Sequence, residues 1–392
     1  MFHDLIEQLL TREQEKGRKK RVRTERRAAF RRELMRPLQL EPLEDRRLLA
    51  YTATLVGGSV ALTGGAAADT LTVDTDGGGL LRHNRFTALD AGFMSDNDFI
   101  SGNGASDDTI MAAAVTSLTA TDPSGNDAVV LAQSPTTTTN ALTLTGGTLS
   151  ASGFTSITDN GNLAISGSSD FAAGTITLGS GTFNVGTLTF NSVGAVVISE
   201  DSGTDIIGVN TAGSLDLDGS GSVNGAGLIT AASVDLDAAT GIGNTTALEL
   251  AATSISADTT SGNVDVDNTL ATAVNVSSLT TTGGSVRIDQ SGGGDLTTGT
   301  VAATTSATAT NSAGAIALDG SVNAASLVAN ASGSVTDGSN GDLAITANAS
   351  ITGGTITLGN DAGNATNFGS LTFNSVGAVV ISEDSGTDII GV

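Results

Sequence analysis

The chain of 392 residues carries few side chains of the types that catalyse reactions or bind transition metals. Its two histidines, His3 and His83, lie far apart in the sequence, and it has no cysteine, so no Cys–His cluster with metal-ligand spacing is present. Serine and aspartate are abundant, but a serine–aspartate pair without a histidine lacks the general base of a nucleophilic triad. We therefore expect both histidines to be ordinary surface residues and the protein not to be an enzyme.

One enzymatic alternative stays open, a β-helix lyase or hydrolase that degrades polysaccharides. Such sites use a pair of carboxylates, or calcium together with a basic residue. Beyond residue 135 the only basic residue is Arg287, tryptophan is absent from the chain, and Tyr51 is its single tyrosine. The many aspartates could supply a carboxylate pair, but their spacing singles none out.

An oxygen-rich segment, LDLDGSGSVNGAG at residues 215–227, has the spacing of an EF-hand-like calcium loop. Loop positions 1, 3, 5 and 9 are filled by Asp216, Asp218, Ser220 and Asn224. Gly221 occupies position 6, where such loops need glycine, but Gly227 stands at position 12 in place of the bidentate acidic residue. The missing ligand and the surrounding strand pattern favour a strand followed by a turn over a calcium loop.

A second oxygen-rich segment, GGAAADTLT at residues 64–72, resembles the repeats-in-toxin nonapeptide GGxGxDxLx, and GASDDTI at residues 104–110 echoes it. In that family, Gly-rich turns place backbone carbonyls and aspartate carboxylates around Ca²⁺, which prefers about six to eight oxygen ligands. The resemblance implies Ca²⁺ as a cofactor, with three ligands in this chain: Asp69, Asp107 and Asp108. The alternative is that these segments are turns between strands, in which aspartate caps its own turn.

The charge is divided sharply along the chain, whose net charge is −24. Residues 1–50 contain 14 Lys and Arg and 9 Asp and Glu, whereas the remainder contains 3 Arg against 32 Asp and Glu. A body this acidic repels phosphate backbones, so we expect no nucleic-acid partner, and it attracts divalent cations. The apolar stretches are much shorter than the roughly 20 residues of a membrane helix, so no transmembrane span is expected.

A segment of 22 residues, LTFNSVGAVVISEDSGTDIIGV, occurs twice without a difference, at residues 188–209 and 371–392. Repetition on this scale predicts an array in which each unit is stabilised by stacking on its neighbours. Arrays of this kind need capping units, and nothing after residue 371 differs from an interior unit. We therefore expect that the chain is a truncated piece of a longer repetitive protein, or that chains self-associate end to end.

Short runs of alternating apolar and polar residues that end in Asp predict half-buried strands in residues 136–392. The apolar residues directly before these Asp residues are predicted to share one register and to point inward: Leu217, Leu236, Val266, Ile288 and Leu318. The absence of aromatic residues from 191 to 367 favours thin stacked coils over an antiparallel sandwich with a large core. We predict an all-β fold, a β-solenoid like a parallel β-helix, with coils of about 20 residues.

The first 50 residues form a basic head. Residues 4–36 are rich in helix formers and Pro37 should end a helix, so the head is predicted to be helical or disordered. The sequence LEPLEDRRLLA at residues 40–50 resembles the LEPR-XLL-type N-terminal motif of large bacterial surface and extracellular proteins, although the apolar core of a secretory signal peptide is absent. The resemblance implies a role in export or sorting for Leu40, Glu41, Pro42, Glu44, Arg46, Arg47, Leu48 and Leu49.

Three regions are predicted: the head at 1–50, a Gly/Asp-rich β region with a degenerate calcium roll at 51–135, and the solenoid at 136–392. The solenoid sequence is similar to filamentous-haemagglutinin-like and related bacterial β-strand-repeat proteins. That resemblance implies an exported structural or adhesive protein at the cell surface or outside the cell, with an unidentified cell-surface, matrix or glycan partner. The alternatives are a calcium-stabilised secreted repeat module and the polysaccharide-degrading enzyme.

Overall fold

The structure is a computed structural model, and the chain divides into two compact units, Met1–Leu48 and Leu49–Val392, which we describe separately. The structure describes residues 10, 12–17, 20–21, 51–65, 68, 70–76, 78–84, 95–96, 99–101, 108–125, 127–131 and 141–391.

The described residues of the first unit are helical and exposed to solvent. Lys16 forms an ion pair with Glu13, with a distance of 2.9 Å between Nζ and Oε1. Both side chains are exposed, so this pair contributes little to stability. The sorting motif predicted at residues 40–50 lies outside the described residues.

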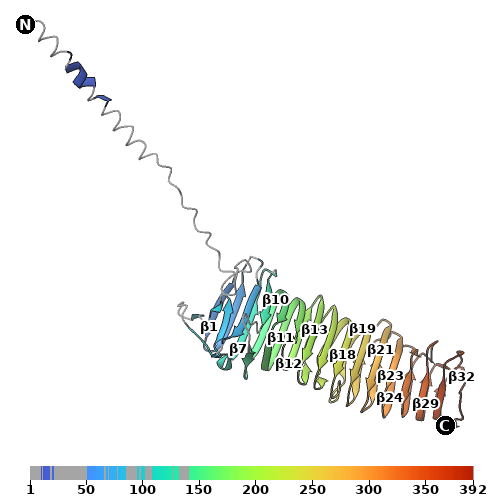
Figure 1. Cartoon of the computed structure of the whole chain (residues 1–392). Coiled ribbons are helices and arrows are strands. Elements are labelled where there is room, and N and C mark those ends of the chain that lie inside the picture. The colour runs from blue at the N-terminus through green and yellow to red at the C-terminus, as the bar shows by residue number, and fades with distance from the viewer. Residues whose placement is uncertain are drawn as a thin grey trace, which may run out of the picture. The chain divides into compact units, whose positions relative to one another are not determined.

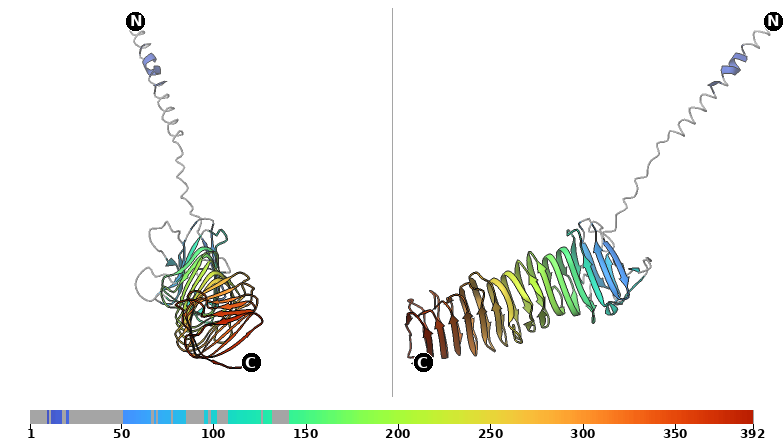
Figure 2. Two further views of the ribbon diagram at one scale, coloured as in Figure 1. Left: turned by 90° about the vertical axis from the view of Figure 1, so that its right-hand side faces the viewer. Right: turned by 180° about the vertical axis from the view of Figure 1, so that it is seen from behind.

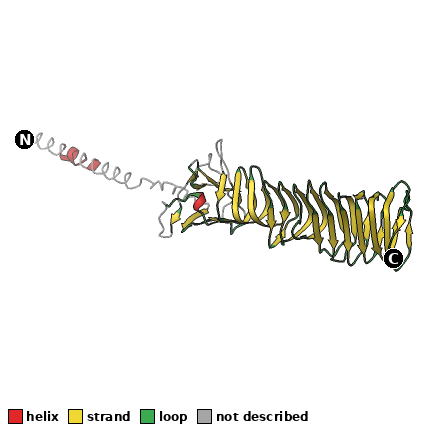
Figure 3. Cartoon of the chain, turned by 90° about the horizontal axis from the view of Figure 1, so that it is seen from below, coloured by secondary structure: helices red, strands yellow, loops and turns green. Residues whose placement is uncertain are grey.

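The second unit is a β-solenoid of about 12 coils, which confirms the predicted fold class (Figures 1 and 2). Strands of one coil pair in parallel with strands of the coils before and after it. Leu163 pairs with Phe183 and Leu215 with Val234, so successive coils at these points are 20 and 19 residues apart. Figure 3 shows the strands stacked along one axis. At about 4.8 Å per coil, 12 coils give a rod about 60 Å long.

The strands follow one another with short turns between them. The N-terminal part contains β1 (Tyr51–Val56), β2 (Ser59–Gly64), β3 (Thr70–Thr75), β4 (Leu81–Asn84), β5 (Ser95–Asp96), β6 (Ile100–Ser101), the 3-10 helix η1 (Ala112–Ala114), β7 (Ser117–Thr121), β8 (Ala128–Leu131) and β9 (Ala141–Leu144). The middle part contains β10 (Thr148–Asp159), β11 (Asn162–Leu178), β12 (Phe183–Ser192), β13 (Ala195–Glu200), β14 (Thr204–Ile206), β15 (Val209–Thr211), β16 (Ser214–Gly219), β17 (Val223–Asn224), β18 (Leu228–Ala238), β19 (Leu248–Thr259), β20 (Val264–Asn268) and β21 (Val274–Thr281). The C-terminal part contains β22 (Val286–Gln290), β23 (Leu296–Ala302), β24 (Ser306–Asn311), β25 (Ile316–Leu318), β26 (Val322–Ala324), β27 (Ser326–Ala331), β28 (Ser334–Thr336), β29 (Leu343–Gly353), β30 (Thr355–Leu358), β31 (Thr366–Ser375), β32 (Val379–Ile381) and β33 (Asp388–Ile389).

The core consists of apolar columns, because parallel pairing places equivalent residues of successive coils directly above one another. One column is formed by Ile157, Ile176, Val196, Leu215, Val234 and Ile255. All six side chains are buried. Each aliphatic residue thus packs on another aliphatic residue one coil away, so the interior is filled with hardly any aromatic side chains.

The five residues predicted to point inward are at most 1% exposed, so that prediction is confirmed. The prediction that they share one register is wrong. Leu217 and Leu236 occupy one column, Val266 and Ile288 a second, and Leu318 a third. Leu236 pairs with Ala257, so the 30-residue step from Leu236 to Val266 is one coil plus the nine residues that lead to another strand.

Buried amides form a polar ladder at one corner of the interior. Asn268, Gln290 and Asn311 pair across three successive coils and are at most 1% exposed. The Nδ2 of Asn268 donates to Oε1 of Gln290 at 2.7 Å, and Nε2 of Gln290 donates to the carbonyl of Leu270 at 2.6 Å. Because buried polar groups are costly when unpaired, these amides stabilise the turns whose carbonyls they bind.

The N-terminal end of the solenoid differs from the rest in containing antiparallel pairs, β1 with β2, β3 with β4 and β4 with β5. Strands β2 and β3 also pair in parallel with β7 and β8, which in turn pair with β10. The parallel ladder therefore continues across residue 135. Beside it, Arg82 binds the buried Asp74 through two contacts, Nε to Oδ1 at 2.9 Å and Nη2 to Oδ2 at 2.7 Å.

A substitution in a column should destabilise the solenoid strongly. Replacing Leu236 with Ala should lower the free energy of unfolding by about 2–5 kcal/mol, because a cavity forms in the core. Leu236→Asp should cost more, since it also buries an unpaired charge. The neighbouring outward residue supplies the control, Asp235→Asn, which should not lower stability. Urea unfolding followed by circular dichroism measures all three, and equal stability of Leu236→Asp and the parent would contradict the column assignment.

Candidate functional site

Five outward aspartates form a feature that we call the acidic ladder: Asp216, Asp218, Asp235, Asp237 and Asp258. They lie on β16, β18 and β19, where strand alternation turns the leucines inward and the aspartates outward. Register pairing places Asp218, Asp237 and Asp258 in one column and Asp216 and Asp235 in the next. Neighbouring strands lie about 4.8 Å apart, so like charges stand next to one another.

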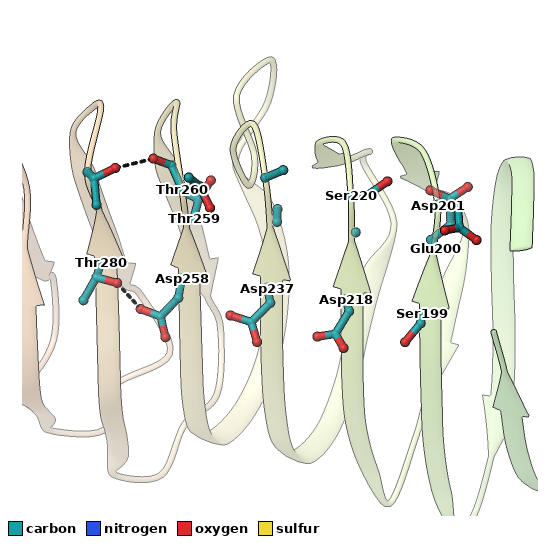
Figure 4. A pocket seen from close by; sticks show the side chains of 14 residues that line it. Ser199, Glu200, Asp201, Asp218, Ser220, Asp237, Asp258, Thr259, Thr260 and Thr280 are labelled. Carbon is teal, nitrogen blue, oxygen red and sulfur yellow. Dashed lines mark hydrogen bonds between the residues drawn. The ribbon is translucent and has the colours of Figure 1, made fainter. Parts of the chain in front are cut away.

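The ladder lines an open groove of about 620 Å³. Figure 4 shows Asp218, Asp237 and Asp258 on successive strands, pointing to the same side, with Ser199 before them and Thr280 after them. The residues that line the groove are acidic or small, and none of them is aromatic or basic. The groove therefore presents oxygen atoms at a regular spacing and offers no stacking surface for a sugar ring.

Burial and mutual repulsion both oppose ionisation of the ladder. Burial raises the pKa of Asp237 above the ordinary carboxyl value, and the charges of Asp235, Asp218, Asp258 and Asp216 raise it further. Burial likewise raises the pKa of Asp216, with added repulsion from Asp218 and Asp235. A like charge nearby disfavours the ionised form of a carboxyl group, so the ladder should take up protons or attract cations more readily than isolated aspartates would.

Hydroxyl groups stabilise one end of the ladder. The Oδ1 atom of Asp258 accepts a hydrogen bond from Ser278 at 2.8 Å and another from Thr280. Both donors belong to β21, one coil beyond Asp258. The carboxylate of Asp258 is thus partly compensated by neutral donors.

A second group of carboxylates shows how the chain neutralises like charges when it uses a cation. Arg287 on β22 lies 2.6 Å from Asp265, 2.8 Å from Asp267 and 3.1 Å from Asp289. Residues 141–391 contain no other lysine or arginine, so the acidic ladder has no basic partner within them. Two neighbouring sets of aspartates therefore differ in charge compensation, one closed by Arg287 and one open to solvent.

The predicted calcium ligands are only partly covered by the structure. Asp69 and Asp107 lie outside the described residues. Asp108 is exposed, and its backbone pairs with that of Phe99 in an antiparallel bridge, with Phe99 N donating to Asp108 O at 2.8 Å. Among the described residues no group of three or more His, Cys, Asp or Glu side chains is arranged to hold a metal ion. Calcium binding therefore stays a prediction.

Two buried carboxylates meet at the glycine that begins the repeats-in-toxin-like segment. A Cβ built on Gly64 would lie 2.5 Å from Oδ2 of Asp127 and 3.2 Å from Oδ1 of Asp122. Both aspartates are at most 4% exposed, and Oδ2 of Asp122 accepts the backbone N–H of Asp127 at 2.7 Å. The sequence analysis did not single out this pair, because about 60 residues separate it from Gly64 and only the coil brings them together.

The EF-hand-like segment is a strand followed by a turn and a short strand, as predicted. Its aspartates lie on β16 as part of the acidic ladder rather than around a loop. Gly221 is explained by close stacking, because a Cβ there would lie 2.4 Å from the backbone N of Gly203 in the preceding coil. Glycine at loop position 6 is therefore a packing requirement and does not indicate calcium.

Two further buried carboxylates were missed, Asp159 and Asp337. Each follows Thr in the repeated stretches TDNG and TDGS, which was the available signal. The Oδ1 atom of Asp159 accepts the backbone N–H groups of Gly179 and Ser180 at 2.9 and 3.1 Å, and Oδ2 of Asp337 accepts that of Gly359 at 2.5 Å. In each case the other carboxylate oxygen is buried without a hydrogen bond, and burial raises the pKa of both groups.

The expectation that both histidines are surface residues is wrong for His83, which is fully buried. Its ring packs on Phe99 with the ring centroids 4.6 Å apart. The antiparallel strand β4 turns His83 inward and Arg82 toward Asp74. His3 lies outside the described residues, as do all eight residues of the predicted sorting motif.

The fold and the ladder together define the class of the protein, a parallel β-solenoid with an acidic outward face. No family model, curated protein sequence or solved structure matches the chain. Within the described residues, no helix has the length and apolar character needed to cross a bilayer.

The buried and crowded carboxyls predict an unusual pH dependence. Each described carboxyl group with a shifted pKa has it raised, with burial as the largest cause: Asp74, Asp159, Asp170, Asp216, Asp237, Asp267 and Asp337. The folded chain then binds protons more tightly than the unfolded chain, so stability is lost as pH rises through the raised values. The thermal midpoint should increase as the pH is lowered from 7 toward 4. Asp159→Asn should raise the midpoint at pH 7 and flatten the profile, whereas acid destabilisation would contradict this assignment.

The two sets of aspartates should respond oppositely to neutralising substitutions. Asp237→Asn should raise the thermal midpoint at low salt, because it removes repulsion within the acidic ladder, and the gain should shrink in about 1 M salt. Arg287→Gln should lower the midpoint, because three carboxylates lose their shared cation. Asp205→Asn, an exposed aspartate outside both sets, is the matched control. Calorimetry at two salt concentrations measures these differences, and a lower midpoint for Asp237→Asn would contradict the repulsion.

Proposed function

We propose that the protein is an exported structural or adhesive protein whose β-solenoid serves as a stiff spacer at the cell surface or outside the cell. The observation that carries this proposal is the unbroken parallel ladder, in which every coil from β7 to β31 pairs with the next. Backbone hydrogen bonds along the axis and filled apolar columns make such a rod resistant to bending and to local opening. A stiff rod suits a part that holds other groups at a distance.

The surface of the rod supports a role outside nucleic-acid metabolism. The acidic ladder and the net charge of −24 repel polyphosphates and keep the rod soluble. A cell-surface, matrix or glycan partner would meet a polar face rich in Ser, Thr and Asp. In the resembling bacterial proteins the head carries the sorting motif, so residues 40–49 are proposed to direct export.

The polysaccharide-degrading alternative is weaker. The acidic ladder does place carboxylates on neighbouring strands, which a glycosidase also requires. Its groove lacks the aromatic and basic side chains that would hold a sugar chain beside those carboxylates. We therefore propose a non-enzymatic role for the groove.

Localisation in the producing cells tests the main proposal. The parent should be recovered from the cell surface or the medium and should be digested by protease added to intact cells. A variant with both Arg46→Ala and Arg47→Ala in the sorting motif should accumulate inside the cell. A variant with Arg12→Ala and Lys16→Ala, also basic residues of the head, is the control and should be exported. Recovery of the parent from the cytoplasm alone would contradict the proposal.

A calcium-stabilised module is the second candidate, and the buried pair Asp122 and Asp127 beside Gly64 favours it. Calcium at about 1 mM should raise the thermal midpoint of the parent by mass action. Asp127→Asn should abolish that rise, whereas Asp237→Asn in the acidic ladder should retain it. Calorimetric titration of the full chain without any calcium heat would remove this candidate and leave the turn interpretation of the segment.

A further inference from the structure

The two identical segments have the same sequence but different surroundings. In the first copy, Phe190 and Ile206 are fully buried. Their counterparts in the second copy, Phe373 and Ile389, are 38% and 69% exposed. Val196 and Ile198 are buried, whereas Val379 and Ile381 are only half-buried. The exposed positions of the second copy are therefore the inward apolar positions of the first.

The second copy nevertheless keeps the same local fold. Ile207 N donates to Leu188 O at 3.0 Å, and Ile390 N donates to Leu371 O at 3.0 Å. The acidic corner is also the same, since Oε1 of Glu200 and of Glu383 each accept a backbone N–H of the preceding coil, at 3.1 and 2.9 Å. The difference between the copies thus lies in what covers them rather than in how they fold.

In the first copy the covering layer is the next coil. Strands β13 and β14 pair on their far side with β16 and β17, and Phe190 N donates to the buried Asn210 at 2.8 Å. In the second copy β32 pairs only with β30, and β33 only with β31, among the described strands. We call the uncovered apolar surface the end face: Phe373, Val379, Ile381 and Ile389.

The end face carries little that would prevent pairing. Strands β31 and β32 contain no charged residue, although charges on edge strands are a common protection against association. The nearby carboxylates of Glu383 and Asp384 are turned back to the preceding coil, where they accept N–H groups of Phe368 and Thr366. The body as a whole is strongly acidic, so an uncharged edge at this place is a distinct local feature.

We propose that the end face binds the end face of a second copy of this chain, tail to tail. An isologous contact covers both apolar faces at once and gives each free strand edge a hydrogen-bonding partner. The other end of the solenoid is built from antiparallel pairs, so it does not offer the matching parallel edge that head-to-tail stacking would need. This inference does not depend on the proposed cellular location.

Light scattering coupled to size-exclusion chromatography tests the contact with matched variants. The parent should elute at twice the 38.7 kDa of one chain. Ile389→Lys should shift it to the single-chain mass without changing the thermal midpoint of the monomer, because the side chain is exposed there. Val376→Lys is the control and should remain dimeric, since its counterpart Val193 is 91% exposed even in the covered first copy. A parent that stays monomeric at high concentration, or a dimer that survives Ile389→Lys, would overturn the proposal.

The orientation is tested with fluorescent labels, because the chain has no cysteine of its own. Gly386→Cys sits in open space near the end face, and Val56→Cys lies on the exposed edge of β1. Energy transfer between two populations labelled at residue 386 supports the tail-to-tail contact. Transfer between residue 56 of one population and residue 386 of another, or growth into open filaments, would show head-to-tail stacking and overturn it.

Discussion

The parallel hydrogen-bond ladder between coils is the constraint on which the rest of the structure depends. It fixes each residue of one coil above a defined residue of the next, at the spacing of neighbouring strands. Side chains of one kind therefore accumulate in columns along the rod. Apolar columns such as the one through Leu215 and Val234 fill the interior, and the amide column through Gln290 satisfies buried carbonyls.

The same constraint explains the acidic ladder, where it is unfavourable. A strand that alternates leucine and aspartate must bring the aspartates together as surely as the leucines. Arg287 relieves this repulsion for Asp265, Asp267 and Asp289, while Asp218, Asp237 and Asp258 are left to protons, solvent cations and neighbouring hydroxyl groups. The chemistry of the surface is thus a consequence of the stacking that builds the core.

The class of fold and the inward residues could be predicted from the sequence, because period-two alternation and a repeat near 20 residues are local signals. Columns could not be assigned, since coils differ by one to three residues and small bulges shift the register, as between Ile255 and Ser256. The groove of the acidic ladder needed three coils to be placed side by side. His83 and the Asp122–Asp127 pair were missed for the same reason, because their burial depends on strands distant in sequence.

The two identical segments occupy the same position within the coil, since Leu188 pairs with Ile206 as Leu371 pairs with Ile389. The stretch from one copy to the other therefore comprises a whole number of coils. Homologous recombination between the corresponding stretches of DNA would remove or add that block while leaving every strand in phase with its neighbours. The rod can thus change its length between generations in one genetic step, with its cross-section and its core preserved.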